Sequence, residues 1–277
     1  MRRNNEERLM GGHKPTHTEE APSMPNPMDF VTPTEFVELP SQGKYPEGHP
    51  LHGKETIEIR YMTAKDEDIL TNRSLLKKGL ALDRLIENLI VDKSINSRSL
   101  YMGDRNAIVI HARASAYGTD YKVNLACPSC GEESRFTFDL TKFETFYGHL
   151  DEDVDLIENG DATFTCTLPK TQIKARFRLL NGYDEVAMAK EMSKKKDDNS
   201  TVTSQMRKYI VDFNGYKDEK TINYVIDNMV ATDSKFLRSC VALATPDVLM
   251  KQEFTCKHCG HEEEVMVPFG TEFFWPE

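Results

Sequence analysis

Apolar residues recur at helical spacing between residues 63 and 92. Five of them follow the spacing of 3, 1, 3 and 1 positions that marks one face of an α-helix: Leu82, Leu85, Ile86, Leu89 and Ile90. Thr63, which is followed by Asp66 and Glu67, is typical of a capped helix start. Gly79 interrupts the segment, so we predict one helix on each side of it.

Four more helices are predicted further along the chain. The first has Asp104 as its N-cap and Gly118 near its C-terminal end. Asp233 can cap the last one, which ends at Pro246. The second ends in a charged loop, and the four cover these ranges: residues 102–118, 182–199, 220–229 and 232–246.

Three other segments alternate apolar and polar positions with a period of two, which predicts β-strands. Residues 120–140 alternate on both sides of a CxxC motif, so we predict a hairpin with the cysteines at its turn. Residues 162–180 form two strands around a PKTQ turn, and residues 251–270 repeat the strand–CxxC–strand pattern. A shorter alternation ends the Pro- and Gly-rich segment at residues 57–61.

The two CxxC motifs carry the clearest chemistry in the chain. Each is followed by glycine, which permits the backbone conformation of a tight turn. Two thiolates at positions i and i+3 of such a turn can bind one tetrahedral ion, and two facing turns complete its shell. The sequence therefore predicts one structural Zn²⁺ ion with four ligands: Cys127, Cys130, Cys256 and Cys259.

Other interpretations of the cysteines are less favoured. Redox-active CxxC motifs open a helix after a strand, whereas these lie on hairpins, and four thiolates leave no open position for catalysis. His258 and His261 flank the second motif and are alternative ligands, although solvated histidines are the simpler interpretation. Cys166 and Cys240 lie on an apolar strand face and in a helix, so we interpret them as buried core thiols.

These elements together predict an α+β fold. A helical N-terminal region and an inserted α+β lobe are joined by a two-turn, four-cysteine zinc ribbon made of β-hairpins. Residues 1–33 are polar and unpatterned, so we predict a flexible N-terminal arm. The other predicted parts are an N-terminal α+β region with the first cysteine turn, the inserted lobe, and the second cysteine turn with an aromatic C-terminal tail: residues 34–145, 146–248 and 249–277.

Composition and motifs exclude several functions. The net charge of −10 argues against a general nucleic-acid binder, which needs a surplus of Lys and Arg. No apolar run approaches the ~18 residues of a membrane span, and no secretion signal is visible. The sequence also lacks a phosphate-binding glycine loop, HExxH and GxSxG. We therefore expect neither an enzyme with a small-molecule substrate nor a membrane protein.

Four long segments carry a resemblance to a known family: FVELPSQGKYPEGHPLHGKETIEIRYMTAKDEDIL, SLLKKGLALDRLIENLIVDKSI, GDRNAIVIHARASAYG before CPSCG, and CKHCGHEEEVMVPFGTEFFWP. Over residues 34–277 the chain resembles the baseplate hub and hub-assembly proteins of T-even-type contractile-tailed bacteriophages. The resemblance implies a non-enzymatic tail protein that is made in the infected bacterium and joins the baseplate or helps to assemble it. The zinc prediction rests on the cysteines of this chain alone.

We therefore expect a structural or assembly component of a phage tail baseplate, in its hub region. It would be assembled in the host cytoplasm and located in the virion, with other baseplate and tail proteins as partners. The N-terminal arm and the tail Phe273-Phe274-Trp275 are candidate contacts, although this tail can equally fold back beside the zinc hairpin. The alternative is a zinc-ribbon nucleic-acid-binding or regulatory protein, which the three consecutive glutamates at 262–264 disfavour.

Overall fold

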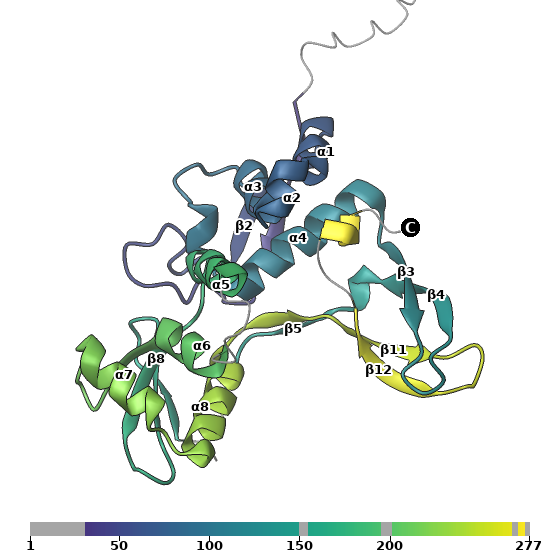
Figure 1. The fold of residues 1–277 in the computed structure, drawn as a ribbon. Helices are drawn as coiled ribbons and strands as arrows, with labels where there is room; N and C mark the ends of the chain where they lie inside the picture. The colour runs from purple at the N-terminus through teal and green to yellow at the C-terminus, as the bar shows by residue number, and fades with distance from the viewer. Residues whose placement is uncertain (1–30, 150–154, 195–200, 268–270, 275–277) are drawn as a thin grey trace, which may run out of the picture. The chain divides into compact units, whose positions relative to one another are not determined.

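The computed structural model describes residues 31–149, 155–194, 201–267 and 271–274. The chain separates into two units, Met1–Thr32 and Pro33–Glu277. The second unit combines helices with small antiparallel sheets, which confirms the predicted α+β class (Figure 1). Nearly all of the predicted N-terminal arm, most of the charged loop after residue 194 and Trp275 lie outside the described residues. The three-part division of residues 34–277 stays a prediction.

The N-terminal part pairs two strands and packs helices against them. Thr63 is the N-cap of the first helix, as predicted, and its backbone N–H donates to Asp66 at 2.8 Å. Three helices replace the predicted two because the Asn72 side chain accepts from the N–H groups of Ser74 and Leu75 and starts a second helix early. The elements are β1 (Thr34–Glu38), β2 (Thr56–Arg60), α1 (Ala64–Thr71), α2 (Arg73–Lys77), α3 (Ala81–Leu89), η2 (Ser97–Ser99) and α4 (Met102–Tyr117).

The predicted cap of α4 is wrong. The helix begins after Tyr101, and Asp104 lies within its first turn with its side chain fully buried. Its carboxylate accepts from the backbone N–H and hydroxyl of Ser41 at 2.9 and 2.6 Å, and from the Tyr45 hydroxyl at 2.6 Å. Asp104 therefore fixes the Pro- and Gly-rich loop between β1 and β2 onto α4 instead of capping the helix.

The predicted cap of the last helix is wrong for the same reason. Helix α8 (Ala231–Ala244) begins after Val230, and the buried Asp233 accepts from the backbone N–H groups of Lys170 and Thr171 at 2.8 and 3.1 Å. Those two residues belong to the PKTQ turn between strands β7 (Thr163–Thr167) and β8 (Lys174–Arg178). In both cases a buried carboxylate finds donors in a distant loop, which local spacing cannot reveal.

The lobe between the two cysteine motifs is built on a four-stranded antiparallel sheet with the order β6-β7-β8-β9. Its buried face carries the predicted alternating residues, among them Phe164, Cys166, Ala175 and Phe177. The predicted helices form, whereas α6, β9 and the short strands β5, β6 and β10 were not predicted. The elements are β5 (Glu144–Phe146), β6 (Leu156–Glu158), β7 (Thr163–Thr167), β8 (Lys174–Arg178), α5 (Gly182–Lys194), α6 (Thr201–Tyr209), β9 (Ile210–Phe213), α7 (Glu219–Asp227), α8 (Ala231–Ala244) and β10 (Asp247–Leu249).

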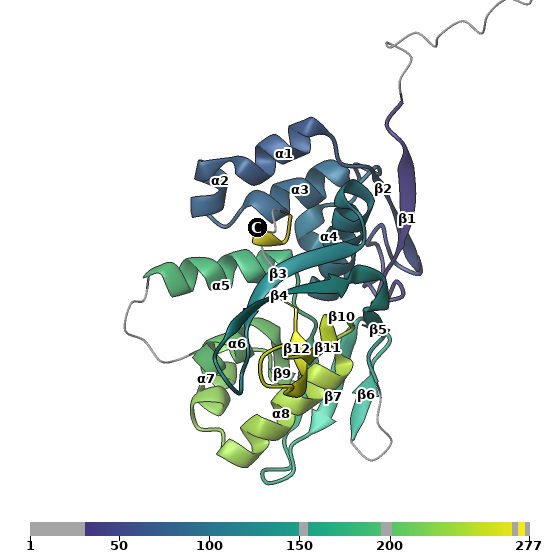
Figure 2. The same cartoon turned by 90° about the vertical axis from the view of Figure 1, so that its right-hand side faces the viewer.

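Two hairpins carry the cysteine motifs, as predicted, and a short helical turn follows the second. They consist of β3 (Asp120–Ala126) with β4 (Glu133–Asp139), β11 (Lys251–Thr255) with β12 (Glu262–Met266), and then the 3₁₀ turn η4 (Thr271–Phe274). Figure 2 shows both hairpins, with strands β3 and β4 running down from the end of α4. Among the described helices, none is long and apolar enough to cross a membrane.

The described part of the aromatic tail folds back onto the chain. Phe273 and Phe274 are each only 1% exposed, and the Phe273 ring lies 4.8 Å from that of Tyr121 on β3. The Arg113 guanidinium on α4 donates to the Phe273 carbonyl at 3.1 Å. These two phenylalanines are therefore core residues, which supports the fold-back alternative over a contact with a partner.

Candidate metal centre

The hairpins place both cysteine motifs at their tips. Strands β3 and β4 pair from Asp120↔Asp139 to Ala126↔Glu133, and Cys127 follows directly. Strands β11 and β12 pair from Lys251↔Met266 to Thr255↔Glu262, and Cys256 follows directly. In each hairpin the strand pairing therefore ends at the residue directly before the first cysteine of the motif.

The two turns have the same backbone construction. In the first, Cys127 N–H donates to the Glu132 carbonyl at 3.0 Å, and Gly131 N–H donates to the Cys127 carbonyl at 2.9 Å. In the second, the corresponding bonds from Cys256 to His261 and from Gly260 to Cys256 measure 2.8 and 3.0 Å.

Each turn also requires its glycine. Gly131 has a φ of +73° and Gly260 a φ of +71°, in the left-handed region that side chains with a Cβ rarely adopt. The glycine after each motif therefore has the conformational role that the sequence predicted.

The four sulfur atoms converge on one point. All four lie within 4.8 Å of one another, and no other His, Cys, Asp or Glu of the described chain joins this group. Two pairs connect the two hairpins: Cys127 with Cys259 at 3.7 Å, and Cys130 with Cys256 at 3.8 Å. All four are free thiols.

These distances can be compared with two kinds of chemistry. A disulfide needs about 2.05 Å between its sulfur atoms. A tetrahedral ion with bonds of about 2.3 Å to sulfur separates its ligands by about 3.8 Å, which follows from the tetrahedral angle. The sulfur positions therefore fit a shared tetrahedral ion and do not fit disulfides.

The surroundings of the sulfurs favour a negative charge on part of the cluster. Backbone N–H groups of Ser129 and His258 point at the Cys127 and Cys256 sulfurs, each at 3.4 Å. Hydrogen bonds from the backbone of Cys259 and His258 lower the pKa of the Cys256 thiol to about 6. A hydrogen bond from the Glu132 backbone lowers the pKa of Cys130, but desolvation and the three other thiols outweigh it and raise that pKa to about 12.

The protein groups alone therefore favour a thiolate at Cys256 and a protonated thiol at Cys130. Removing the protons from all four cysteines requires a cation among them.

An apolar layer lies beneath the cluster. Cys127 and Cys256 are buried together with Phe254, whereas Cys130 and Cys259 are exposed. The Phe254 ring lies 4.3 Å from that of Phe136, which joins β11 to β4 across the two hairpins. The sequence showed these aromatic residues only as strand positions, and their contact depends on how the hairpins face each other.

The other candidate ligands lie elsewhere. His261 places its Nε2 3.1 Å from the Glu263 carboxylate, on the strand leading away from the second turn. Cys166 and Cys240 are buried on β7 and α8, where a hydrogen bond from one to the other raises the pKa of Cys166 and lowers that of Cys240. Their prediction as core thiols is confirmed.

The family of the chain follows from comparison with protein-family models. The model described as T4 bacteriophage base plate protein matches residues 32–275. The chain belongs to this family. It is therefore a T4-type phage baseplate protein and part of the virion tail, where it interacts with other tail proteins. No curated protein and no solved structure matched the chain.

Proposed function

We propose that this baseplate protein is a non-enzymatic structural or assembly component of the hub region, and that its four clustered cysteines hold one structural Zn²⁺. The observation that carries the proposal is the pair of sulfur distances of 3.7 and 3.8 Å between the two hairpins. Four thiolates in a tetrahedral arrangement favour zinc or an iron centre, and zinc is the commoner structural ion. The hairpins would then form the predicted zinc ribbon.

A closed shell of four thiolates suits a structural role better than a catalytic one. Catalytic zinc sites keep an open position for water or substrate, whereas here the four clustered cysteines would fill all four tetrahedral positions. The site would therefore stabilise the fold. In zinc-finger peptides the binding free energy of such ions is about 10–16 kcal/mol.

The ion would join segments that are far apart in the sequence. The sulfurs of Cys127 and Cys259 come from positions 132 residues apart, and the whole inserted lobe lies between them. A second polar link lies at the other end of the hairpins, where the Gln252 amide donates to the Asp139 carbonyl at 2.7 Å. With both ends connected, the second hairpin would be held in place before the chain continues to the buried Phe273 and Phe274.

Metal analysis of the purified full-length chain tests the zinc part of the proposal. We expect one zinc per chain by mass spectrometry of the metal, and no visible absorption of the kind that an iron–thiolate centre produces. Cys256→Ser should lower the zinc content, whereas Cys240→Ala, which removes a buried thiol from the lobe, should not. Full zinc content in Cys256→Ser would disprove the shared site.

Analysis of particles tests the baseplate role separately. Mass spectrometry of purified virions is expected to detect the chain if it is a permanent hub component. Its presence in baseplate precursors alone would identify an assembly factor. Its absence from both would contradict the structural role and leave the zinc result untouched.

The nucleic-acid alternative lacks support from the site. Glu262, Glu263 and Glu264 directly follow the second turn, and all three are exposed. Phosphate groups would be repelled from this end of the hairpins. Binding of DNA or RNA at low salt would be required to revive the alternative.

A further inference from the structure

A groove lies between the α2–α3 turn and helix α5, away from the cysteine cluster. One wall is the continuous segment Leu76–Asp83, and the other is formed by residues of α5, including Val186, Ala189 and Lys190. The groove has a volume of about 750 Å³. This size lies within the range of sites that bury a ligand or an anchoring side-chain cluster.

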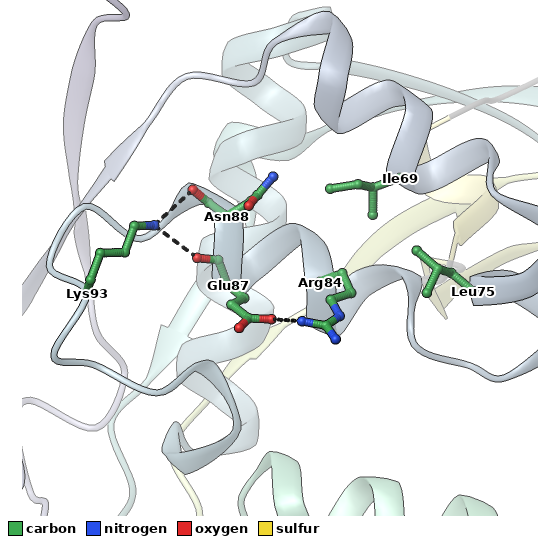
Figure 3. Close-up of a pocket in the computed structure, with 6 residues that line it drawn as sticks. All are labelled: Ile69, Leu75, Arg84, Glu87, Asn88 and Lys93. Carbon is green, nitrogen blue, oxygen red and sulfur yellow. Dashed lines mark hydrogen bonds and ion pairs between the residues drawn. The ribbon is translucent and has the colours of Figure 1, made fainter.

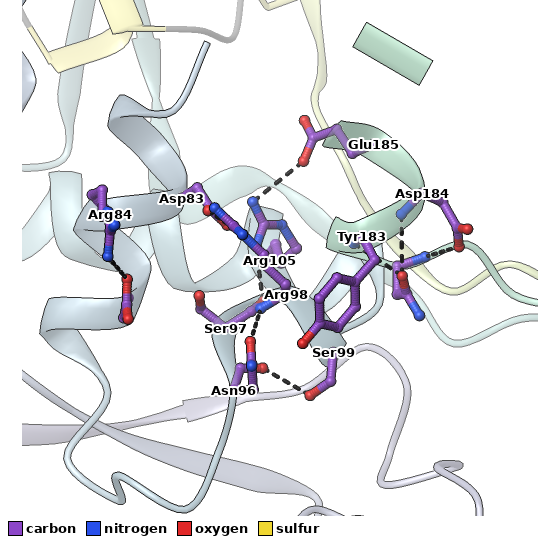
Figure 4. Close-up of polar contacts among 12 residues, drawn as sticks. Asp83, Arg84, Asn96, Ser97, Arg98, Ser99, Arg105, Tyr183, Asp184 and Glu185 are labelled. Carbon is purple, nitrogen blue, oxygen red and sulfur yellow. Dashed lines mark hydrogen bonds and ion pairs between the residues drawn. The ribbon is translucent and has the colours of Figure 1, made fainter. Parts of the chain in front are cut away.

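Ion pairs fix the floor of the groove (Figure 4). The Arg105 guanidinium, whose side chain is 5% exposed, lies 3.3 Å from Asp83 on one wall and 3.2 Å from Glu185 on the other. It also donates to the Ser97 carbonyl at 2.8 Å. Gly182 at the start of α5 allows this arrangement, because a Cβ there would lie 2.8 Å from an Arg105 nitrogen. The walls are therefore held apart at a fixed spacing.

The walls leave apolar side chains uncovered. Helix α2 contains no buried residue, and Leu76 at its end is 37% exposed. Leu80, Leu82 and Val186 are only partly buried along the same groove. Covering such surface removes apolar area from water, which stabilises a complex.

The available charge in the groove is positive. Lys77 and Lys78 line it, and the acidic lining residues Asp83 and Glu185 are both paired with Arg105. The N-terminal end of α3 adds a partial positive charge on the same side. This local excess contrasts with the net charge of −10 of the whole chain.

A smaller pocket on the other side of α2 lacks this property (Figure 3). It measures about 390 Å³ and also has an apolar part, at Ile69 and Leu75. Its cations already have partners: Arg84 pairs with Glu87 at 2.7 Å, and Lys93 donates to the Ile90 carbonyl at 2.6 Å. Apolar lining together with the positive charge of Lys77 and Lys78 therefore distinguishes the larger groove.

We propose that this groove binds an acidic amphipathic helix of another baseplate or tail protein. An extended peptide needs an open strand edge for its backbone hydrogen bonds, and neither wall here contains a strand. A helix satisfies its own backbone and can present leucine-like anchors to Leu76 and Val186 and carboxylates to Lys77 and Lys78. The proposal uses none of the four clustered cysteines and does not depend on the metal.

Binding of two designed helical peptides to the full-length chain tests the proposal. Both carry leucines at helical spacing; one has glutamates on its flanks and the other has lysines at those positions. By fluorescence anisotropy, the acidic peptide should bind the chain, and the basic one should not. The double variant Lys77→Glu/Lys78→Glu should weaken acidic-peptide binding by about tenfold or more and should gain binding of the basic peptide.

Two controls make the result specific. Lys217→Glu/Lys220→Glu makes the same charge change on exposed residues at the start of α7, so acidic-peptide binding should stay within about twofold. Leu76→Ser should weaken the binding of the acidic peptide to the chain, and also the binding of the basic peptide to the Lys77→Glu/Lys78→Glu variant. Equal binding of the two peptides, or no effect of the Lys77/Lys78 change, would overturn the proposal.

The occupant in the particle can be identified by a photo-crosslinking residue at position 76, with position 216 as the control. The expected product is a crosslink from position 76 to an acidic, helix-patterned segment of a different tail protein. A crosslink to a second copy of this chain, or to its own residues 1–30, would overturn the proposed occupant. Unchanged zinc content in these variants would separate the groove from the metal site.

Discussion

The Cys127 sulfur lies 3.7 Å from the Cys259 sulfur, although 132 positions separate the two residues. The inserted lobe between them thus begins and ends at one small cluster of thiols. A bound ion at this point would close a long loop, which constrains the unfolded chain as well as the folded one.

Removing the ion with a strong chelator is expected to loosen the second hairpin before the rest of the fold. Without a cation no ion links the two cysteine turns, and the apolar contact of Phe136 with Phe254 is too small to hold two hairpins alone. Limited trypsin digestion should then cut at Lys251 and Lys257. Chelation should not increase trypsin cleavage of Cys256→Ser any further. Equal resistance to trypsin of treated and untreated wild-type protein would contradict this prediction.

Gly260→Ala is expected to weaken metal binding as well as stability. The alanine Cβ would occupy a backbone conformation with φ of +71°, which costs about 1–2 kcal/mol, and the turn can relieve it only by moving Cys259. Gly215→Ala is the matched control: its φ is +83° and it also has open space for a Cβ, but it lies in the lobe. Thermal unfolding should show a similar loss of stability in both variants. Competition with a zinc chelator should show a loss of zinc affinity only in Gly260→Ala.

Both motifs show what a sequence can predict. A turn of five or six residues such as Cys127–Glu132 is fixed by local chemistry, so its thiols and its glycine predicted its conformation. The alternation of β3, β4, β7 and β8 is equally local and predicted the pairing of these strands.

Long-range contacts escaped the sequence. Asp104 and Asp233 look like helix caps, but their partners are 63 residues away in loops that fold onto them. The groove also depends on long-range contacts, because Arg105 pairs with Asp83 on one wall and Glu185 on the other, which are distant in the chain. Spacing rules contain no information on which distant donor reaches a buried carboxylate.

Asp66→Asn is expected to destabilise the protein at neutral pH by about 1–3 kcal/mol, because a buried hydrogen-bonded carboxylate is lost. Burial alone would raise the pKa of Asp66, but hydrogen bonds from Arg60, Thr63 and Asn88 outweigh it and lower that pKa. The stabilising contribution is therefore present above the unfolded-state pKa of about 3.9 and is lost as the pH falls through the lower folded-state value.

Urea unfolding at several pH values measures this effect. The difference between wild type and Asp66→Asn should be full at pH 7 and should shrink below about pH 4, where the wild-type carboxyl takes up its proton. Asp68→Asn on the exposed side of α1 provides the control and should stay within about 0.5 kcal/mol of wild type. A difference that is independent of pH would show that Asp66 acts through packing alone.

Arg113→Lys is expected to release the C-terminal tail without affecting the metal. Arg113 is only 2% exposed. Its guanidinium donates to the carbonyls of Phe273, Gly118 and Asp120, at 3.1, 2.8 and 3.3 Å. A lysine ammonium cannot reproduce this planar fork, so at least one buried carbonyl loses its donor at a cost of about 1–3 kcal/mol. Chymotrypsin should then cleave at Phe273 and Phe274 more rapidly than in wild type.

The exposed Arg238 on α8 is a matched control for this change. It donates to the Ser234 carbonyl at 3.3 Å on the helix surface, so Arg238→Lys should leave the tail protected. Zinc content should be the same in all three proteins, because Arg113 contacts neither hairpin tip. Rapid cleavage accompanied by zinc loss would instead mean that the tail and the metal site unfold as one unit. Protection of the tail in Arg113→Lys would show that the packing of Phe273 against Tyr121 suffices to hold it.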